Sequence, residues 1–142
     1  MPEIATMHLN GKKIESGWSA AMKSCLVVDD SKVVRMVARK ILEGLNFRID
    51  EAENGKMAVE VCTKQMPDAI LLDWNMPVMS GIEFLRHLRK MEGGQLPVVV
   101  FCTTENDIQH IQEAIGAGAN EYIMKPFDSE IIESKFSQVG LI

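Results

Sequence analysis

The sequence lacks a long hydrophobic run, an excess of basic residues and a secretory signal. None of its 142 residues lie in an uninterrupted apolar stretch approaching 18 residues, so no membrane-spanning helix is expected. The formal net charge is -5, which argues against the basic surface that nucleic-acid binding normally requires. The N-terminus has no apolar signal core, and we therefore expect a cytoplasmic protein.

Cysteine and histidine are few and scattered. Cys25, Cys62 and Cys102 share no metal-ligand spacing and lie among apolar residues, which indicates buried thiols in a reducing compartment. The histidines at positions 8, 87 and 110 form no ligand cluster either. The sequence thus gives no sign of a site built on sulfur or imidazole.

The length and the 46% hydrophobic content suit one globular domain with a real core. Residues 1–22 contain several polar residues and glycines without sustained periodicity. We interpret them as a flexible N-terminal extension or a cloning remnant. The folded domain is expected over residues 23–142.

Short apolar runs alternate along this domain with segments whose apolar residues recur at helical spacing. The runs predict strands at 25–28, 47–53, 69–73, 96–104 and 120–127. The periodic segments predict helices at 31–45, 55–66, 81–91, 106–119 and 128–139. In the first helix the periodic positions are Val33, Val34, Val37, Ile41 and Leu45, and in the fourth they are Ile108, Ile111 and Ile115.

Five strands in strict alternation with five helices indicate a fold class. The strands are apolar runs rather than alternating ones, which is typical of a parallel sheet covered by helices on both faces. Crossovers between parallel strands are expected to be right-handed. The predicted fold is an α/β three-layer sandwich with a five-stranded parallel sheet and five helices, of the flavodoxin-like type.

Polar residues follow the strands at the edge where such sheets bind ligands, beyond the carboxyl ends. We expect the following residues at this rim: Asp29, Asp30, Asp73, Asn75, Thr103, Thr104 and Lys125. Each also has a plainer explanation, because acids cap helices, Asp ends strands, Thr favours strands and Lys favours the surface. Taken singly, capping and turn roles are favoured. Together, their convergence on one edge favours a site.

The residue types at this rim favour phosphoryl chemistry. Clustered carboxylates raise one another's pKa unless a cation lies among them, and hard oxygen ligands suit Mg²⁺. Metal, the Lys125 ammonium and a hydroxyl could together neutralise phosphoryl oxygens. Asp73 could then act as a nucleophile and form an aspartyl phosphate.

Four segments resemble a known family. "VVDDS", "LLDWNMP" with Gly81, "FCTTE" and "YIMKPF" are similar in order and separation to the receiver domain of two-component response regulators. The similarity spans roughly residues 22–142, and stand-alone chemotaxis receivers of the CheY type match it best. The resemblance implies that Asp73 is the phosphoacceptor, Asp30 a direct Mg²⁺ ligand, Asp29 a ligand through water, and Asn75 a ligand through its backbone carbonyl.

The resemblance also implies a switch. Thr103 corresponds to the hydroxyl that moves to the phosphoryl group, Tyr122 to the aromatic that turns inward with it, and Lys125 to the pairing lysine. From the sequence alone, Tyr122 is a half-buried strand aromatic. The Lys125–Pro126 bond is often cis in this family.

Residues flanking the acceptor bear on phosphoryl lifetime. Thr104 stands where many family members have alanine, and its bulk could alter access for water or a phosphodonor. Asn75 and Glu105 resemble the pair of quickly self-dephosphorylating chemotaxis receivers. We hypothesise a short-lived phosphoryl state.

The expected protein is a signalling phosphoacceptor that catalyses only its own phosphoryl transfer and autodephosphorylation. No output domain is expected after residue 139, so the output should be a surface made by residues 107–119, the strand of Tyr122 and the last helix. Expected partners are a sensor histidine kinase or histidine phosphotransfer protein and a downstream protein target. Three alternatives remain: a phosphorylation-independent binding module, an aspartyl-nucleophile phosphatase and a flavodoxin-like cofactor binder. The phosphatase would need a general acid two residues after the nucleophile, where this sequence has Asn75.

Overall fold

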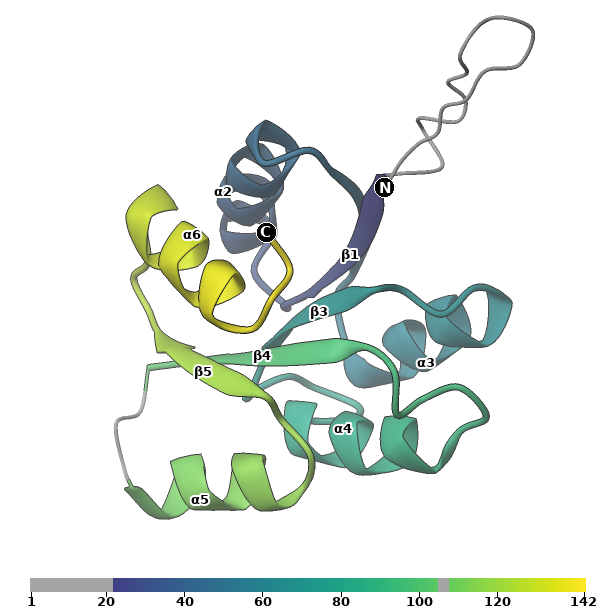
Figure 1. Cartoon of the computed structure of the whole chain (residues 1–142). Coiled ribbons are helices and arrows are strands. Elements are labelled where there is room, and N and C mark those ends of the chain that lie inside the picture. The colour runs from purple at the N-terminus through teal and green to yellow at the C-terminus, as the bar shows by residue number, and fades with distance from the viewer. Residues whose placement is uncertain (1–21, 105–107) are drawn as a thin grey trace, which may run out of the picture.

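The computed structural model describes residues 22–104 and 108–142, which form a five-stranded sheet between two layers of helices (Figure 1). All paired strands run parallel, in the order β2-β1-β3-β4-β5. The strands are β1 (Lys23–Val28), β2 (Phe47–Ala52), β3 (Ala69–Asp73), β4 (Val98–Thr103) and β5 (Glu121–Met124). The predicted fold class is confirmed.

Helices connect the strands as the sequence pattern predicts. They are α2 (Lys32–Gly44), α3 (Gly55–Lys64), α4 (Gly81–Lys90), α5 (Ile108–Gly116) and α6 (Ser129–Gln138). Their ends lie within a few residues of the predicted ones where they can be compared. Within the two described ranges, no helix is both long and apolar enough to cross a membrane.

Each face of the sheet has its own hydrophobic core. Helices α2 and α6 cover one face and α3, α4 and α5 cover the other (Figure 1). Successive strand residues point to opposite faces, so Leu26 and Leu72 belong to the α3–α5 side while Val27 and Leu71 belong to the α2–α6 side. Burial on both faces explains why the strands are continuous apolar runs.

Helix α2 has more apolar residues than it buries against the sheet. Ala38 and Leu42 are completely buried, whereas Val33 and Val37 are 69% and 44% exposed. The two valines lie in the first half of the helix and line an open groove rather than the core. Helical spacing therefore identified the helix, but it did not identify which apolar residues contact the sheet.

Helix α5 departs from its sequence pattern in the same way. Ala114 is its buried residue, while Ile108 is 67% and Ile115 46% exposed. Ala114 is the residue of α5 that belongs to the core on this side of the sheet, and the longer Ile108 and Ile115 lie outside it. Two apolar side chains thus remain on the surface of α5.

Candidate functional site

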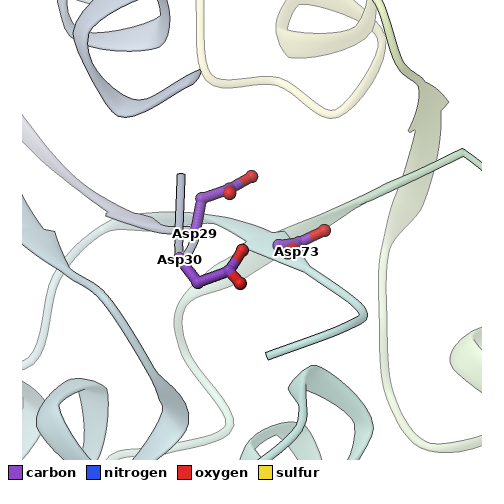
Figure 2. Close-up of side chains that lie close together, drawn as sticks. All are labelled: Asp29, Asp30 and Asp73. Atoms are coloured by element: carbon purple, nitrogen blue, oxygen red, sulfur yellow. The ribbon is translucent and has the colours of Figure 1, made fainter. Parts of the chain in front are cut away.

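Three carboxylates meet at the carboxyl end of the sheet. Asp29 and Asp30 directly follow β1, and Asp73 is the last residue of β3, the neighbouring strand. One oxygen from each lies within 4.8 Å of the others, and Figure 2 shows the three side chains gathered at the rim. Asp29 and Asp73 are buried, whereas Asp30 is exposed. The sequence prediction that these acids converge is confirmed by the geometry.

The backbone around Asp73 is fixed by its neighbours. The amide of Gly81 donates to the carbonyl of Trp74 at 2.9 Å. A Cβ atom at position 81 would overlap the backbone oxygen of Asp73, so only glycine permits this approach. Ser80 and Glu83 form a capping box that starts α4 at this point. The start of α4 therefore packs directly on the residue at the centre of the site.

Lys125 joins two of the acids. Its Nζ lies 2.8 Å from Asp29 Oδ2 and 3.0 Å from Asp73 Oδ1. Its backbone amide donates to the Thr103 carbonyl at 2.9 Å, which places the residue beside the end of β4. The Lys125–Pro126 peptide bond is cis, as the resemblance led us to expect. Three strands, β1, β3 and β5, thus deliver one cationic and three anionic groups to one place.

Burial and charge shift the ionisation of this cluster. Loss of hydration raises the pKa of Asp73 to about 6; the hydrogen bond from Lys125 opposes this rise, and the charge of Asp29 adds to it. For Lys125, burial disfavours the ammonium, but hydrogen bonds to Asp29 and Asp73 outweigh it and raise its pKa. A second cation beside the three carboxylates would favour their ionised forms.

The donor set fits a magnesium ion. Three carboxylates within reach of one point are hard oxygen ligands, and the exposed side of Asp30 leaves room for water. Asn75, two residues beyond Asp73, is exposed on the same loop. Cys102 on β4 pairs in register with Asp73. It is buried, and burial raises the pKa of its thiol to about 12. A soft metal would lack thiolate ligands here.

The predicted switch residues lie on adjacent strands. Thr103 is buried at the end of β4, whereas Thr104 is exposed. Tyr122 in β5 is half-buried and pairs in register with Phe101. The Nζ of Lys135, from α6, lies 5.3 Å from the centre of the Tyr122 ring. Tyr122 therefore lies between the core and a charged surface residue.

Two contacts near the site were not predicted from the sequence. Trp74, directly after Asp73, packs on Phe101 at 5.0 Å and on His110 at 4.8 Å between ring centres. His110 thereby links α5 to the loop after Asp73, although no role was predicted for it from the sequence. Glu105, predicted to modulate the site, lies outside the described residues.

Arg35 is the second unpredicted contact. Its guanidinium donates to the backbone carbonyl of Asp29 at 2.7 Å and to Glu51 at 2.9 Å. The sequence pattern did not indicate these contacts, because Arg35 lies on α2 whereas its acceptors follow β1 and lie in β2. Knowledge that α2 packs beside these two strands would have been needed to pair Arg35 with Glu51.

An apolar groove of about 410 Å³ borders the site. It lies between the first half of α2 and the segment after β5, and Lys125 forms part of its wall. Its lining residues are Val33, Val34, Val37, Thr104, Lys125, Pro126 and Phe127. The carboxylate cluster thus lies next to an apolar surface, with Lys125 between the two.

Comparisons with known proteins agree with this geometry. The family described as "Response regulator receiver domain" matches residues 25–137. The chemotaxis protein CheY of Halobacterium salinarum is 36% identical over 117 residues, which is 82% of this chain and 96% of that protein.

The structure of the chemotaxis response regulator CheY4 of Vibrio cholerae is similar, with a TM-score of 0.80 and 30% identity, covering 84% of this chain and 99% of that one. A receiver domain of the sensor histidine kinase PA1611 from Pseudomonas aeruginosa has a TM-score of 0.76 and 28% identity, covering 83% and 97%. That protein was solved with a magnesium ion coordinated in its active-site cleft.

Proposed function

The chain belongs to the response regulator receiver domain family of two-component signalling proteins, and on that premise we propose that it accepts a phosphoryl group on Asp73. The single observation that best supports this proposal is the contact of Lys125 with both Asp73 and Asp29 beside three converging carboxylates. A lysine bound to the acceptor oxygen can pair with the new phosphoryl oxygens after transfer.

In the proposed reaction, a carboxylate oxygen of Asp73 attacks the phosphorus of a phosphohistidine. The O–P bond forms as the P–N bond breaks, and the imidazole leaves with the bonding electrons. Lys125 neutralises charge on the transferred group, and the buried position of Asp73 limits access of water from the sheet side. Asp73 must be ionised to attack, and with its pKa at about 6 it is so at neutral pH.

Magnesium is the proposed cofactor. Asp30 and Asp29, with Asp73 and the backbone carbonyl of Asn75, would hold the ion, Asp29 through water. The bound ion would supply positive charge to the phosphoryl oxygens. The donor set described above supports this choice, and so does the magnesium in the cleft of the PA1611 receiver domain.

The proposed output is a change of affinity on the face of α5, β5 and α6. A phosphoryl group on Asp73 would attract the Thr103 hydroxyl, and the half-buried ring of Tyr122 could then turn into the vacated volume. The exposed Ile108 and Ile115 on α5 make this face suitable for protein contact. We propose a downstream protein target there and a sensor histidine kinase or histidine phosphotransfer protein as the donor.

The proposed phosphoryl state is short-lived. Asn75 and Thr104 are both exposed at the rim, where they can meet an incoming water molecule. Decay of the phosphorylated protein at neutral pH, followed by phosphate release, measures the lifetime. Replacement of Thr104 by alanine tests its share, and a lifetime of many hours in the unchanged protein would contradict this part of the proposal.

The test of phosphorylation uses acetyl phosphate and Mg²⁺ with intact-protein mass spectrometry. We expect the mass of one phosphoryl group on the unchanged chain and none on Asp73→Asn. Absence of transfer from both acetyl phosphate and a phosphorylated histidine phosphotransfer domain would overturn the proposal. Partner capture with and without beryllofluoride then tests the output: equal capture in both states would indicate a binding module that acts independently of phosphorylation.

A further inference from the structure

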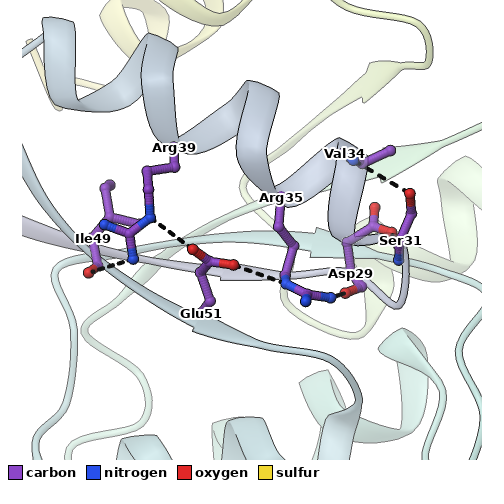
Figure 3. Close-up of polar contacts among 7 residues, drawn as sticks. All are labelled: Asp29, Ser31, Val34, Arg35, Arg39, Ile49 and Glu51. Carbon is purple, nitrogen blue, oxygen red and sulfur yellow. Dashed lines mark hydrogen bonds and ion pairs between the residues drawn. The ribbon is translucent and has the colours of Figure 1, made fainter.

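Arg35 contacts the peptide between the two metal-binding acids. Its Nη1 donates to the backbone carbonyl of Asp29 at 2.7 Å, while its Nε donates to Glu51 Oε1 at 2.9 Å. Figure 3 shows the guanidinium between the two acceptors. The arginine side chain is 15% exposed, so both contacts are largely screened from water.

The carbonyl of Asp29 is a sensitive point in the loop. It belongs to the planar peptide group that ends at the Cα atom of Asp30, so its direction sets where the Asp30 side chain begins. A hydrogen bond that fixes this carbonyl therefore fixes the orientation of the whole Asp29–Asp30 link.

The other polar groups of Asp29 are held by separate parts of the chain. Its backbone amide donates to the Ala52 carbonyl at 3.1 Å, its Oδ1 accepts from the Ser31 amide at 2.9 Å, and its Oδ2 pairs with Lys125 at 2.8 Å. Arg35 supplies the fourth contact. None of the other three contacts involves an atom of the Asp29–Asp30 peptide group, so the hydrogen bond from Arg35 is the one among the four that opposes rotation of this peptide plane.

Glu51 orients the guanidinium from the far side. Its Oε2 accepts from Arg39 Nε at 2.6 Å while its Oε1 accepts from Arg35, so one carboxylate on β2 aligns two arginines of α2. The hydrogen bond from Arg39, chiefly, lowers the pKa of Glu51 and keeps it ionised. Glu51 offsets part of the charge of Arg35, and the direct contact of the guanidinium with the loop of the acids is its hydrogen bond to the Asp29 carbonyl.

We propose, on the basis of the proposed magnesium-dependent function, that Arg35 is a positioning residue: it fixes the Asp29–Asp30 peptide so that both carboxylates converge with Asp73 on the ion. Arginine suits this task because its planar fork donates to two acceptors in different directions. A lysine, with one compact ammonium, cannot hold both acceptors in the same way.

Arg39 is the matched control. It lies one turn further along α2 and shares Glu51, but its other acceptors are Glu43 and the carbonyl of Ile49, away from the acids. Removing it disturbs the same ion-pair network without touching the Asp29 peptide. A difference between the two arginines therefore separates positioning from general stability.

The experiment is calorimetric titration of the full chain with MgCl₂ at constant ionic strength, with urea unfolding of each variant as the stability measure. We expect Arg35→Met to raise the dissociation constant for Mg²⁺ about 10-fold or more, the usual effect of losing an outer-sphere partner. For Arg39→Met we expect less than about a 2-fold change. Arg35→Lys should bind Mg²⁺ several-fold more weakly than the unchanged chain, although it keeps the charge.

Equal Mg²⁺ affinity of Arg35→Met and the unchanged chain would overturn the inference, and so would equal losses in both arginine variants. If Arg35→Met does not fold, Arg35→Lys decides, and normal affinity in that variant contradicts the proposed role. Failure of the unchanged chain to bind Mg²⁺ or to be phosphorylated would instead show that the proposed function itself is wrong.

Discussion

At the scale of single residues, the site concentrates unfavourable charge. Asp73 is buried beside Asp29, and Lys125 is the cation that contacts both. This arrangement makes the carboxylate costly in the absence of metal, as its raised pKa of about 6 indicates. A buried acid whose ionised form is unfavourable is a sign of a group that serves chemistry rather than stability.

Replacement of Asp73 by asparagine should stabilise the metal-free protein at neutral pH. Because the folded-state pKa of Asp73 is raised to about 6, its contribution to stability is full below pH about 4 and is lost as the pH rises through about 6. The gain from Asp73→Asn should therefore reach about 3 kcal/mol at most above pH 7 and shrink as the pH falls. Urea unfolding at several pH values measures it, with exposed Asp50→Asn as control. A gain that does not change with pH would contradict the assignment.

Val78 is strained in the loop that follows Asp73. Its φ is 70°, and the amide of Met79 donates to the Pro77 carbonyl at 2.7 Å, which closes a tight γ-turn around it. A β-branched residue disfavours this backbone, whereas Asn46 adopts the same φ of 70° elsewhere in the chain. The branched side chain of Val78 therefore adds to the strain of the turn itself.

Replacement of Val78 by asparagine should raise the free energy of unfolding by about 1 kcal/mol, because asparagine tolerates a positive φ. The side chain is 76% exposed, so little packing is lost. Val33→Asn, at another exposed valine but in helix α2, should give no gain. Urea unfolding distinguishes the two, and equal effects at both positions would argue against backbone strain.

At the scale of elements, helix starts position the site. Ser31 starts α2 by accepting from the Val34 amide, and its own amide donates to Asp29. Ser80 starts α4, and the next residue, Gly81, packs on the Asp73 backbone. The same local signals that begin a helix thus also fix the acids at the ends of β1 and β3.

Gly81→Ala should destabilise the protein by about 1–3 kcal/mol, since the new methyl group would overlap the Asp73 carbonyl. The displacement should also lower the rate of phosphorylation from acetyl phosphate. Gly44→Ala is the control, because a Cβ at the last residue of α2 meets nothing within 4 Å. Thermal unfolding and mass spectrometry measure both effects, and similar results for the two variants would refute the close-approach explanation.

At the scale of the whole molecule, the sheet brings separated parts of the chain to one edge. The site combines residues that follow β1, end β3 and follow β5. They meet because β1 and β3 are neighbours and β5 is separated from β3 by one strand, with all of them parallel. Ligand binding at this edge should therefore stabilise the entire fold. Both hydrophobic cores are stabilised together with the site, because they contain residues of the strands that end there.

Magnesium should raise the stability of the unchanged chain by about 1.4 kcal/mol at ten times its dissociation constant. Asp30→Asn should abolish this gain. Without Mg²⁺ the variant should be at least as stable as the unchanged chain, because Asp30 is exposed and its charge raises the pKa of Asp73. The order of stability should thus reverse on adding the metal. Urea unfolding with and without MgCl₂, at matched ionic strength, tests for this reversal.

The sequence by itself determined the order of elements, the parallel sheet and the convergence of the acids on one rim. These follow from local periodicity and from the rule that parallel strands share an edge, which need no knowledge of side-chain contacts. The proposed roles of Asp73 and Lys125 rest on the same logic and on the family's motifs.

Only the tertiary structure decided which apolar residues face the core and which polar groups hold the acids in place. Val33 and Ile108 fit a helical stripe, yet Ala38 and Ala114 are the residues buried in the core, because burial depends on which side of each helix faces the sheet. Arg35 contacts the Asp29 carbonyl after β1 and Glu51 in β2, and contacts between a helix and two neighbouring strands leave no periodic trace in the sequence.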